Sequence, residues 1–154
     1  MEDISRYLIF MLDHRLFALP LDMVERVERA VEITPLPQVP DIVPGIINYK
    51  GTVLPVCDIR PRFQLPQREI RLEDQLIIVK TIGRTIALLV DTVTDNIEKP
   101  SREVVPPPDI ADGAAYLAGI LKLEDGIALI PDLNKILTPQ EDRALAKAMK
   151  RTKQ

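Results

Sequence analysis

Residues 45–60 read GIINYKGTVLPVCDIR, and this stretch carries the strongest structural signal in the chain. Apolar residues dominate positions 46–49 and 52–56, on either side of a Lys50-Gly51 dipeptide. Glycine supplies the backbone angles that a tight turn needs, so the pattern predicts a β-hairpin. We expect Asp58 to end this hairpin by accepting backbone hydrogen bonds before a short helical turn.

Three similar pairs of apolar runs lie elsewhere, at residues 7–12 with 16–19, 76–81 with 85–90, and 117–123 with 127–130. Val, Ile and Leu dominate these runs, and Gly or Asp separates each pair, so each pair predicts a further hairpin. Prolines cluster at 35–44 and 106–108, where they mark loops or sheet edges. The clearest helical signal comes after Thr138, an N-cap followed by a first-turn proline, so residues 139–154 should form a C-terminal helix with a frayed tail.

The chain also contains an internal repeat. When residues 7–24 are aligned with 76–93, six of eighteen positions are identical. Residues 45–59 align with 119–133 in the same way, so that Gly45 matches Gly119 and Asp58 matches Asp132. Two blocks that repeat in the same order at nearly one offset indicate duplication.

The repeat divides the chain into two halves, residues 4–70 and 71–138, each built as two strands, a connector and two more strands. Neither half is comfortably large enough to be stable alone, so two small β-barrels should pack together and share a third core. The sequence therefore predicts an all-β fold related by internal duplication, with a short C-terminal helix.

Composition excludes several classes of protein. The chain has 154 residues, 46% of them hydrophobic and 28% charged, as in an ordinary soluble domain. The net charge of −3 and an aromatic content of 4% disfavour a nucleic-acid-binding surface. One cysteine and one histidine exclude a disulfide framework and a multi-histidine zinc site.

Catalytic motifs are absent from the sequence: it has no nucleophile elbow, P-loop or dinucleotide fingerprint. Cys57 should be a buried inert thiol and His14 a solvated turn residue. We therefore expect no enzyme activity, no cofactor and no metal. The N-terminus lacks a basic region ahead of an apolar run, and the apolar runs are too short to span a bilayer, which favours a cytoplasmic protein.

The 45–60 stretch resembles the signature of the CheW family, the adaptor proteins of bacterial chemotaxis. The family pattern is a glycine, an apolar pair, Asn-Leu-Arg-Gly, an apolar pair, proline, a second apolar pair and Asp-Leu. The chain matches this spacing at Gly45, Asn48, Gly51, Pro55 and Asp58. A second landmark surrounds Asp91, and a third combines residues 119–120 with the turn at Gly126. The resemblance covers about residues 4–138.

The resemblance implies two intertwined five-stranded, SH3-like β-barrels, in agreement with the repeat. It also implies a non-enzymatic scaffold that couples methyl-accepting chemoreceptors to the histidine kinase CheA. One face would hold the receptor's helical hairpin tip, and another would meet the CheW-like regulatory domain of the kinase, barrel against barrel. Such a protein associates with membrane receptor arrays through its partners, without inserting into the membrane or binding nucleic acid.

The resemblance also assigns residues to roles. Those implied at the receptor groove are Val24, Arg26, Val27, Asn48, Lys50, Val90 and Val93. Those implied as structural landmarks are Gly45, Gly51, Pro55, Asp58, Asp91, Gly119, Gly126 and Asp132.

Two positions depart from the family pattern. Lys50 stands where the family has arginine, and Arg26 stands where it has an acid. We expect Lys50 to be exposed at the groove between the halves and to pair with a receptor acid, and we expect the cognate receptor to carry an acid opposite Arg26. Two alternatives stay open at this point: an adaptor of another chemosensory pathway, such as pilus motility or gene regulation, and a small-barrel nucleic-acid-binding protein.

Overall fold

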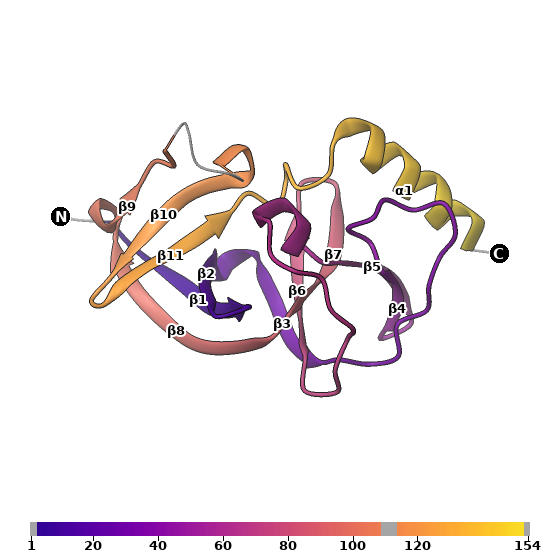
Figure 1. Ribbon diagram of the computed structural model, residues 1–154, viewed down its shortest axis with the longest axis horizontal. Helices are drawn as coiled ribbons and strands as arrows, with labels where there is room; N and C mark the ends of the chain where they lie inside the picture. Colours follow the sequence, from indigo (N-terminus) through magenta and orange to yellow (C-terminus); the bar gives the residue numbers. More distant parts are fainter. Residues whose placement is uncertain (1–2, 109–113, 153–154) are drawn as a thin grey trace.

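The computed structural model describes residues 3–108 and 114–152, which form two β-sheets, several 3-10 helices and an α-helix (Figure 1). The first repeat contains β1 (Ile4–Leu12), β2 (Arg15–Pro20), η1 (Leu21–Met23), β3 (Val24–Arg29), β4 (Gly45–Tyr49), β5 (Thr52–Cys57) and η2 (Arg60–Phe63). The second contains β6 (Gln75–Thr81), β7 (Arg84–Val90), β8 (Thr92–Pro100), η3 (Ser101–Glu103), β9 (Val104–Val105), η4 (Ala114–Tyr116), β10 (Leu117–Leu123) and β11 (Gly126–Pro131). The helix α1 (Pro139–Thr152) follows.

The strand order agrees with the internal repeat. Sheet B has the order β3-β6-β7-β5-β4, and sheet A has the order β8-β1-β2-β11-β10-β9. If each strand of sheet B is replaced by its repeat counterpart, the first five strands of sheet A result. Both sheets also contain one parallel pair at the same place, β5 with β7 and β11 with β2. The all-β fold with a C-terminal helix is confirmed.

Each sheet takes strands from both halves of the sequence. The N-terminal hairpin β1–β2 joins strands of the second repeat, and the hairpin β6–β7 joins strands of the first. The boundary between residues 70 and 71 therefore divides the sequence but not the sheets. This exchange of hairpins makes the sheets mutually dependent, because neither can be completed by one half of the chain.

Two details of the expected barrels are wrong. Sheet A has six strands rather than five, and in the described residues neither sheet closes into a continuous barrel. The chain leaving β3 reaches β4 only at an isolated bridge between Thr34 and Ile46, and the chain leaving β8 passes through η3 before β9 pairs with β10. Prolines at 35, 37 and 100 have no backbone N–H to donate beside these interruptions. The backbone hydrogen bonds between strands are therefore interrupted there, and neither sheet closes into a barrel.

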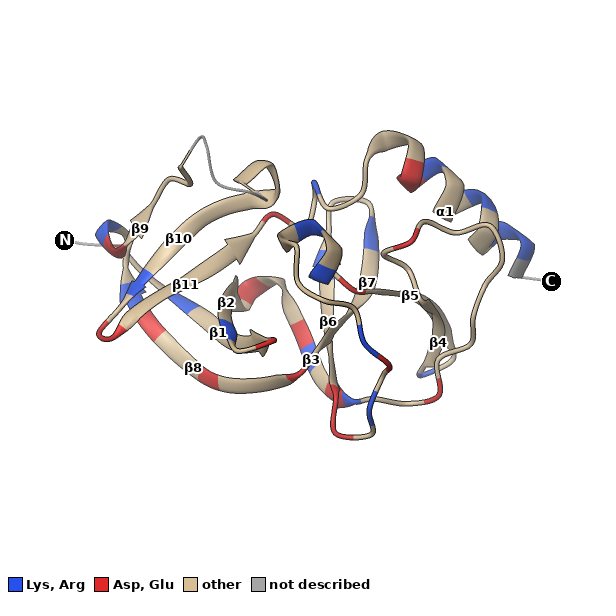
Figure 2. Cartoon of the chain, in the orientation of Figure 1, with Lys and Arg blue, Asp and Glu red and all other residues tan. Residues whose placement is uncertain are grey.

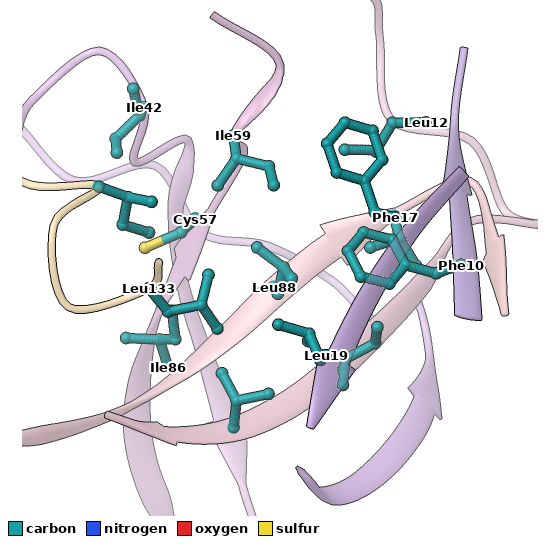
Figure 3. Packing of buried hydrophobic residues seen from close by; sticks show 14 of the residues in the cluster. Phe10, Leu12, Phe17, Leu19, Ile42, Cys57, Ile59, Ile86, Leu88 and Leu133 are labelled. Atoms are coloured by element: carbon teal, nitrogen blue, oxygen red, sulfur yellow. The ribbon is translucent and has the colours of Figure 1, made fainter. Parts of the chain in front are cut away.

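The apolar core has three parts, as the repeat predicts. One cluster lies within sheet B around Ile78 and Leu89, and another lies within sheet A around Ile9 and Ala128. The largest cluster lies between the sheets and contains side chains from both (Figure 3). Alternation along the strands explains the division, since neighbouring residues of one strand point to opposite faces.

Aromatic rings tie the central cluster together. Phe10 stacks on Phe17 with ring centroids 5.5 Å apart, and Phe17 meets Phe63 edge-on at 5.3 Å. Because Phe63 belongs to η2, this contact fixes the segment that follows β5 against sheet A. Burying one such ring contributes about 1.5–3 kcal/mol.

The predicted C-terminal helix is present and is capped as expected. Thr138 Oγ1 accepts a hydrogen bond from the Glu141 N–H at 3.1 Å, and Glu141 Oε1 accepts one from the Thr138 N–H at 2.9 Å. Leu145 and Ala148 are fully buried, and Leu145 belongs to the central core. Among the described residues, no helix is long and apolar enough to cross a membrane.

Candidate partner-binding surfaces

The β3 strand presents Arg26 between two half-buried valines. A bulge between Val24 and Arg26 shifts the alternation, so Val24 and Val27 both pack against the central core. The side chain of Arg26 is 51% exposed, and its Nε lies 3.7 Å from a carboxylate oxygen of Glu28. The result is a cation over an apolar base, which suits a partner with an acidic group.

The turn between β4 and β5 presents Lys50. Lys50 and Gly51 have φ values of 51° and 86°, the left-handed pair that a tight hairpin turn requires. Asn48 Oδ1 accepts a hydrogen bond from the Gly51 N–H at 2.9 Å, and the Lys50 ammonium lies 5.3 Å from the Tyr49 ring centroid. The family landmark Asn-x-x-Gly therefore builds this turn and exposes Lys50 on it.

The expected position of Lys50 between the two halves is wrong. The residue is exposed, but β4 lies on the side of sheet B away from sheet A (Figure 1). The β4 edge is held by β5 and by the bridge to Thr34, which directs the turn outward. Lys50 and Asn48 therefore belong to a different surface from the valines of β3.

Val90 and Val93 lie at the junction of the sheets. Val90 is 0% exposed, so the expectation that it contacts a partner is wrong, because its side chain is enclosed in the central core. Val93 is half-buried against the same core, and its N–H donates to Gln75 Oε1 at 2.6 Å. Val24, Val27 and Val93 thus share the border of the central core.

Sheet A carries a groove that sequence reasoning missed. Its volume is about 1030 Å³, and apolar residues such as Ile9, Ile97 and Ile120 line it. Four carboxylate residues also line it, Asp95, Glu98, Glu124 and Asp125, together with Arg15, Lys99 and His14. An apolar groove edged by charge is a common form of protein interface.

The repeat alignment relates this groove to the sheet B surface. The bulge in β8 lies between Val93 and Asp95, as the bulge in β3 lies between Val24 and Arg26. The β10–β11 turn contains Glu124 where the β4–β5 turn contains Lys50. At each of these two equivalent positions, sheet B therefore carries a cation and sheet A carries an anion. The alignment could have identified Asp95 and Glu124 from the sequence.

A buried ion cluster lies behind these surfaces. The Arg60 side chain is 1% exposed, and its Nη1 donates to Asp58 Oδ1 at 3.1 Å. Arg60 also pairs with Asp91, and Arg68 donates to Asp91 at 2.6 Å and to Asp74 Oδ1 at 2.7 Å. Asp91 therefore links η2 and the segment before β6 to the end of β7.

The ion cluster also reaches sheet A. Asp91 Oδ2 accepts the Asp13 N–H at 2.9 Å, and the Asp91 N–H donates to the Met11 carbonyl at 3.0 Å. Burial acts to raise the pKa of Asp74, but hydrogen bonds from Arg68 and Arg71 outweigh it and hold that pKa below its usual value. Arg60 was missed by sequence reasoning, although it ends the stretch that resembles the family signature.

The structural landmarks occupy equivalent places in the two sheets. A Cβ on Gly45 would lie 2.3 Å from the Thr34 carbonyl oxygen, and one on Gly119 would lie 3.2 Å from the Val105 carbonyl oxygen. The N–H groups of Asp58 and Asp132 each donate a 2.7 Å hydrogen bond, to Ile42 and Tyr116. Pro55 is buried opposite Ile46, and Gly126 begins β11 after its turn.

Cys57 is poorly suited to act as a nucleophile. The side chain is buried, and burial raises the pKa of its thiol to about 12, so the reactive thiolate is strongly disfavoured. Within residues 3–108 and 114–152, no group of three or more His, Cys, Asp and Glu residues could hold a metal ion. The geometry offers surfaces for partners rather than a reaction centre.

Comparison with known proteins identifies the family. A family model described as a CheW-like domain matches residues 6–141. Chemotaxis protein CheW of Rhizobium meliloti is 30% identical over 132 residues, covering 84% of each chain, and protein FrzA of Myxococcus xanthus is 30% identical over 131 residues, covering 83% of this chain and 82% of its own.

A solved structure also supports this family. The crystal structure of scaffolding protein TtCheW from Thermoanaerobacter tengcongensis matches with a TM-score of 0.82 and 30% identity, covering 92% of this chain and 91% of its own. The chain therefore belongs to the CheW family, whose members are scaffolds rather than enzymes.

Proposed function

We propose that this chain is a chemotaxis adaptor that joins methyl-accepting chemoreceptors to the histidine kinase CheA. The observation that carries the proposal is the separation of two exposed cationic surfaces on opposite edges of sheet B, Arg26 on β3 and Lys50 in the β4–β5 turn. One rigid body then offers two separate surfaces that differ in their apolar surroundings, which lets it bind two partners at once.

The receptor surface in this proposal is the β3 face at the junction of the sheets. Val24, Val27 and Val93 supply half-buried apolar area, and Arg26 supplies an exposed cation beside them. A helical hairpin with apolar residues and an acidic residue on one face fits this combination. Arg26 then determines which receptors are accepted, because the common family residue at this position is an acid.

The kinase surface in this proposal is the β4–β5 end of sheet B, where Lys50 is exposed. A CheW-like domain of the kinase would approach barrel against barrel and place a carboxylate near Lys50. The acidic turn of this chain's own sheet A, with Glu124 at the equivalent position, illustrates the complementary chemistry. In this proposal Lys50 contacts the kinase, whereas the family resemblance implied a contact with the receptor.

Paired charge reversals test both assignments. The full-length chain and the variants Lys50→Glu and Arg26→Glu are titrated separately with the cognate receptor hairpin and with the CheW-like domain of CheA. Lys50→Glu should weaken kinase binding by about 1–3 kcal/mol and leave receptor binding within twofold. Arg26→Glu should weaken binding of the cognate receptor and leave kinase binding unchanged.

The outcomes separate the possibilities. If Lys50→Glu weakens receptor binding alone, the kinase assignment of this turn is wrong and the receptor uses it. If neither variant changes either affinity, both residues are ordinary solvated side chains. If the chain fails to bind a verified receptor and CheA simultaneously, the adaptor proposal itself fails.

A further inference from the structure

Two charged features are left unused by the proposed adaptor surfaces, and they lie at opposite ends of the molecule. The helix α1 lies beside sheet B and carries several basic residues (Figure 2). The acidic groove lies on sheet A, at the other end. The family-model match ends at residue 141, so most of α1 lies outside the part of the chain that defines the family.

Basic residues form one continuous face of α1. Arg143, Lys147, Lys150 and Arg151 follow a spacing of four, three and one, which places them along one side of an α-helix, and all four are exposed. The four residues span about 12 Å at 1.5 Å per residue. None of them forms an ion pair with a described residue.

The two acids of α1 do not neutralise this face. Glu141 accepts hydrogen bonds from Arg62 and from the Thr138 N–H, and Asp142 pairs with Arg84 at 2.8 Å. Both acids are therefore used to fix the helix to the body of the protein. The helix is a rigid support whose basic face is free to meet an acidic surface.

The groove on sheet A has the chemistry to receive long basic side chains. Lys and Arg have aliphatic stems that cover apolar surface while their charged ends reach polar groups. The groove supplies an apolar floor, and Asp95, Glu124 and Asp125 supply carboxylates that form no ion pair with a described residue. Glu98 is paired with Arg6, and Arg15 and Lys99 on the rim leave a negative balance.

We propose that the basic face of α1 docks into the sheet A groove of a second copy of this chain. Both complementary surfaces belong to the same protein, and they lie at opposite ends, so each copy can donate a helix and receive one. Such a contact is heterologous and head-to-tail, and it extends by further additions unless rotation closes a ring. It occupies neither the β3 face nor the β4–β5 turn.

Sedimentation of the purified full-length chain tests the contact. At 50 mM salt the average mass should rise with protein concentration above the 17.4 kDa of the single chain, and at 500 mM salt it should return to that value. A mass that stays at one chain at every concentration and salt level overturns the proposal.

Charge reversal makes the test specific. Variant G carries Glu124→Lys and Asp125→Lys in the groove, and variant H carries Lys147→Glu and Lys150→Glu on the helix. Each should be monomeric alone, because variant G places cations in the groove and variant H leaves the helix face with no net charge. An equimolar mixture should form pairs, since the unaltered basic helix of G meets the unaltered acidic groove of H. Failure of the mixture to associate overturns the proposal.

Matched controls exclude a general charge effect. The control for variant G is Glu32→Lys with Glu73→Lys, and the control for variant H is Arg29→Glu with Arg71→Glu. Each control changes the net charge by the same amount as its variant, at exposed positions outside both surfaces. Both controls should associate like the wild type. If they also dissociate, net charge rather than the contact controls assembly. A Lys50→Glu variant that loses kinase binding but still associates shows that the two proposals stand or fall separately.

Discussion

The two sheets share one strand order but differ in how each is finished. Sheet A ends in an open groove with an acidic rim, whereas sheet B is covered by η2, the segment before β6 and α1. The shared features are those that a β-hairpin cannot lose, such as the glycines at 45 and 119 and the aspartates at 58 and 132. The different features lie on the surface.

This contrast shows how a duplicated fold can present different surfaces on one scaffold. The exchange of hairpins joins the sheets around one apolar core, so they cannot easily separate or move independently. Once that core exists, surface positions of the two copies are free to diverge. Arg26 against Asp95 and Lys50 against Glu124 show divergence in charge at structurally equivalent places.

The largest expected difference between the copies concerns Arg60 and its repeat counterpart Asn134. Arg60 is buried beside Asp58 and Asp91, whereas Asn134 is exposed. Arg60→Ala leaves the buried Asp58 carboxylate without its ion-pair partner and should reduce the free energy of unfolding by about 3–5 kcal/mol. Asn134→Ala should cost less than about 1 kcal/mol. Urea unfolding of both variants measures the difference.

A useful companion variant is Arg60→Met with Asp58→Asn, which removes both charges of this buried pair together. It should recover part of the loss, because fewer unpaired charges stay buried. Equal stability of the Arg60→Ala and Asn134→Ala variants would show that the ion cluster contributes nothing that distinguishes the two sheets.

The equivalent glycines should respond unequally to the same substitution. A Cβ at Gly45 would lie 2.3 Å from the Thr34 carbonyl oxygen, a backbone atom of the bridge that connects the β3 side to β4. Gly45→Ala should therefore destabilise the protein by about 1–3 kcal/mol. Gly119→Ala has nearest contacts of 3.1 and 3.2 Å and should cost clearly less. Thermal unfolding compares them, and a reversed order contradicts the structure.

Much of this architecture could be predicted from the sequence. Short apolar runs with turn residues identified the hairpins, and the two alignment offsets identified the repeat, because alternation and turn chemistry are local properties. The cap at Thr138 identified the helix for the same reason. The C-terminal helix and the four hairpins therefore needed no tertiary information.

The remaining features depend on contacts between distant residues. The burial of Val90 depends on the packing of two sheets, and the outward position of Lys50 depends on which edge of sheet B the β4–β5 hairpin occupies. Arg60 meets Asp91, which is 31 residues away, through a cluster that no local pattern reveals. The groove on sheet A depends on several strands at once. Family resemblance implied the function, but the surfaces had to come from the fold.

The smallest expected effect concerns the helix that covers sheet B. Burial acts to raise the pKa of Glu141, but hydrogen bonds from Thr138 and Arg62 outweigh it and hold that pKa below its usual value of 4.5. A lowered native pKa means that the ionised carboxylate stabilises the folded state. This contribution is complete above pH 4.5 and is lost as the pH falls through the lower native value.

The variant Glu141→Gln tests whether the charge of Glu141 helps to hold α1 on sheet B. At pH 7 the variant should lose about 1 kcal/mol, because the amide keeps part of the cap but not the charge that faces Arg62. Below pH 4.5 the stabilities of wild type and variant should converge, since wild-type Glu141 becomes neutral as well. Urea unfolding at pH 7, 5, 4 and 3 measures this convergence.

Glu124→Gln on the open groove is the matched control and should show no loss at pH 7. A constant gap between wild type and Glu141→Gln at every pH would mean that the cap acts through shape alone, and that the charge contributes nothing to holding α1 on sheet B.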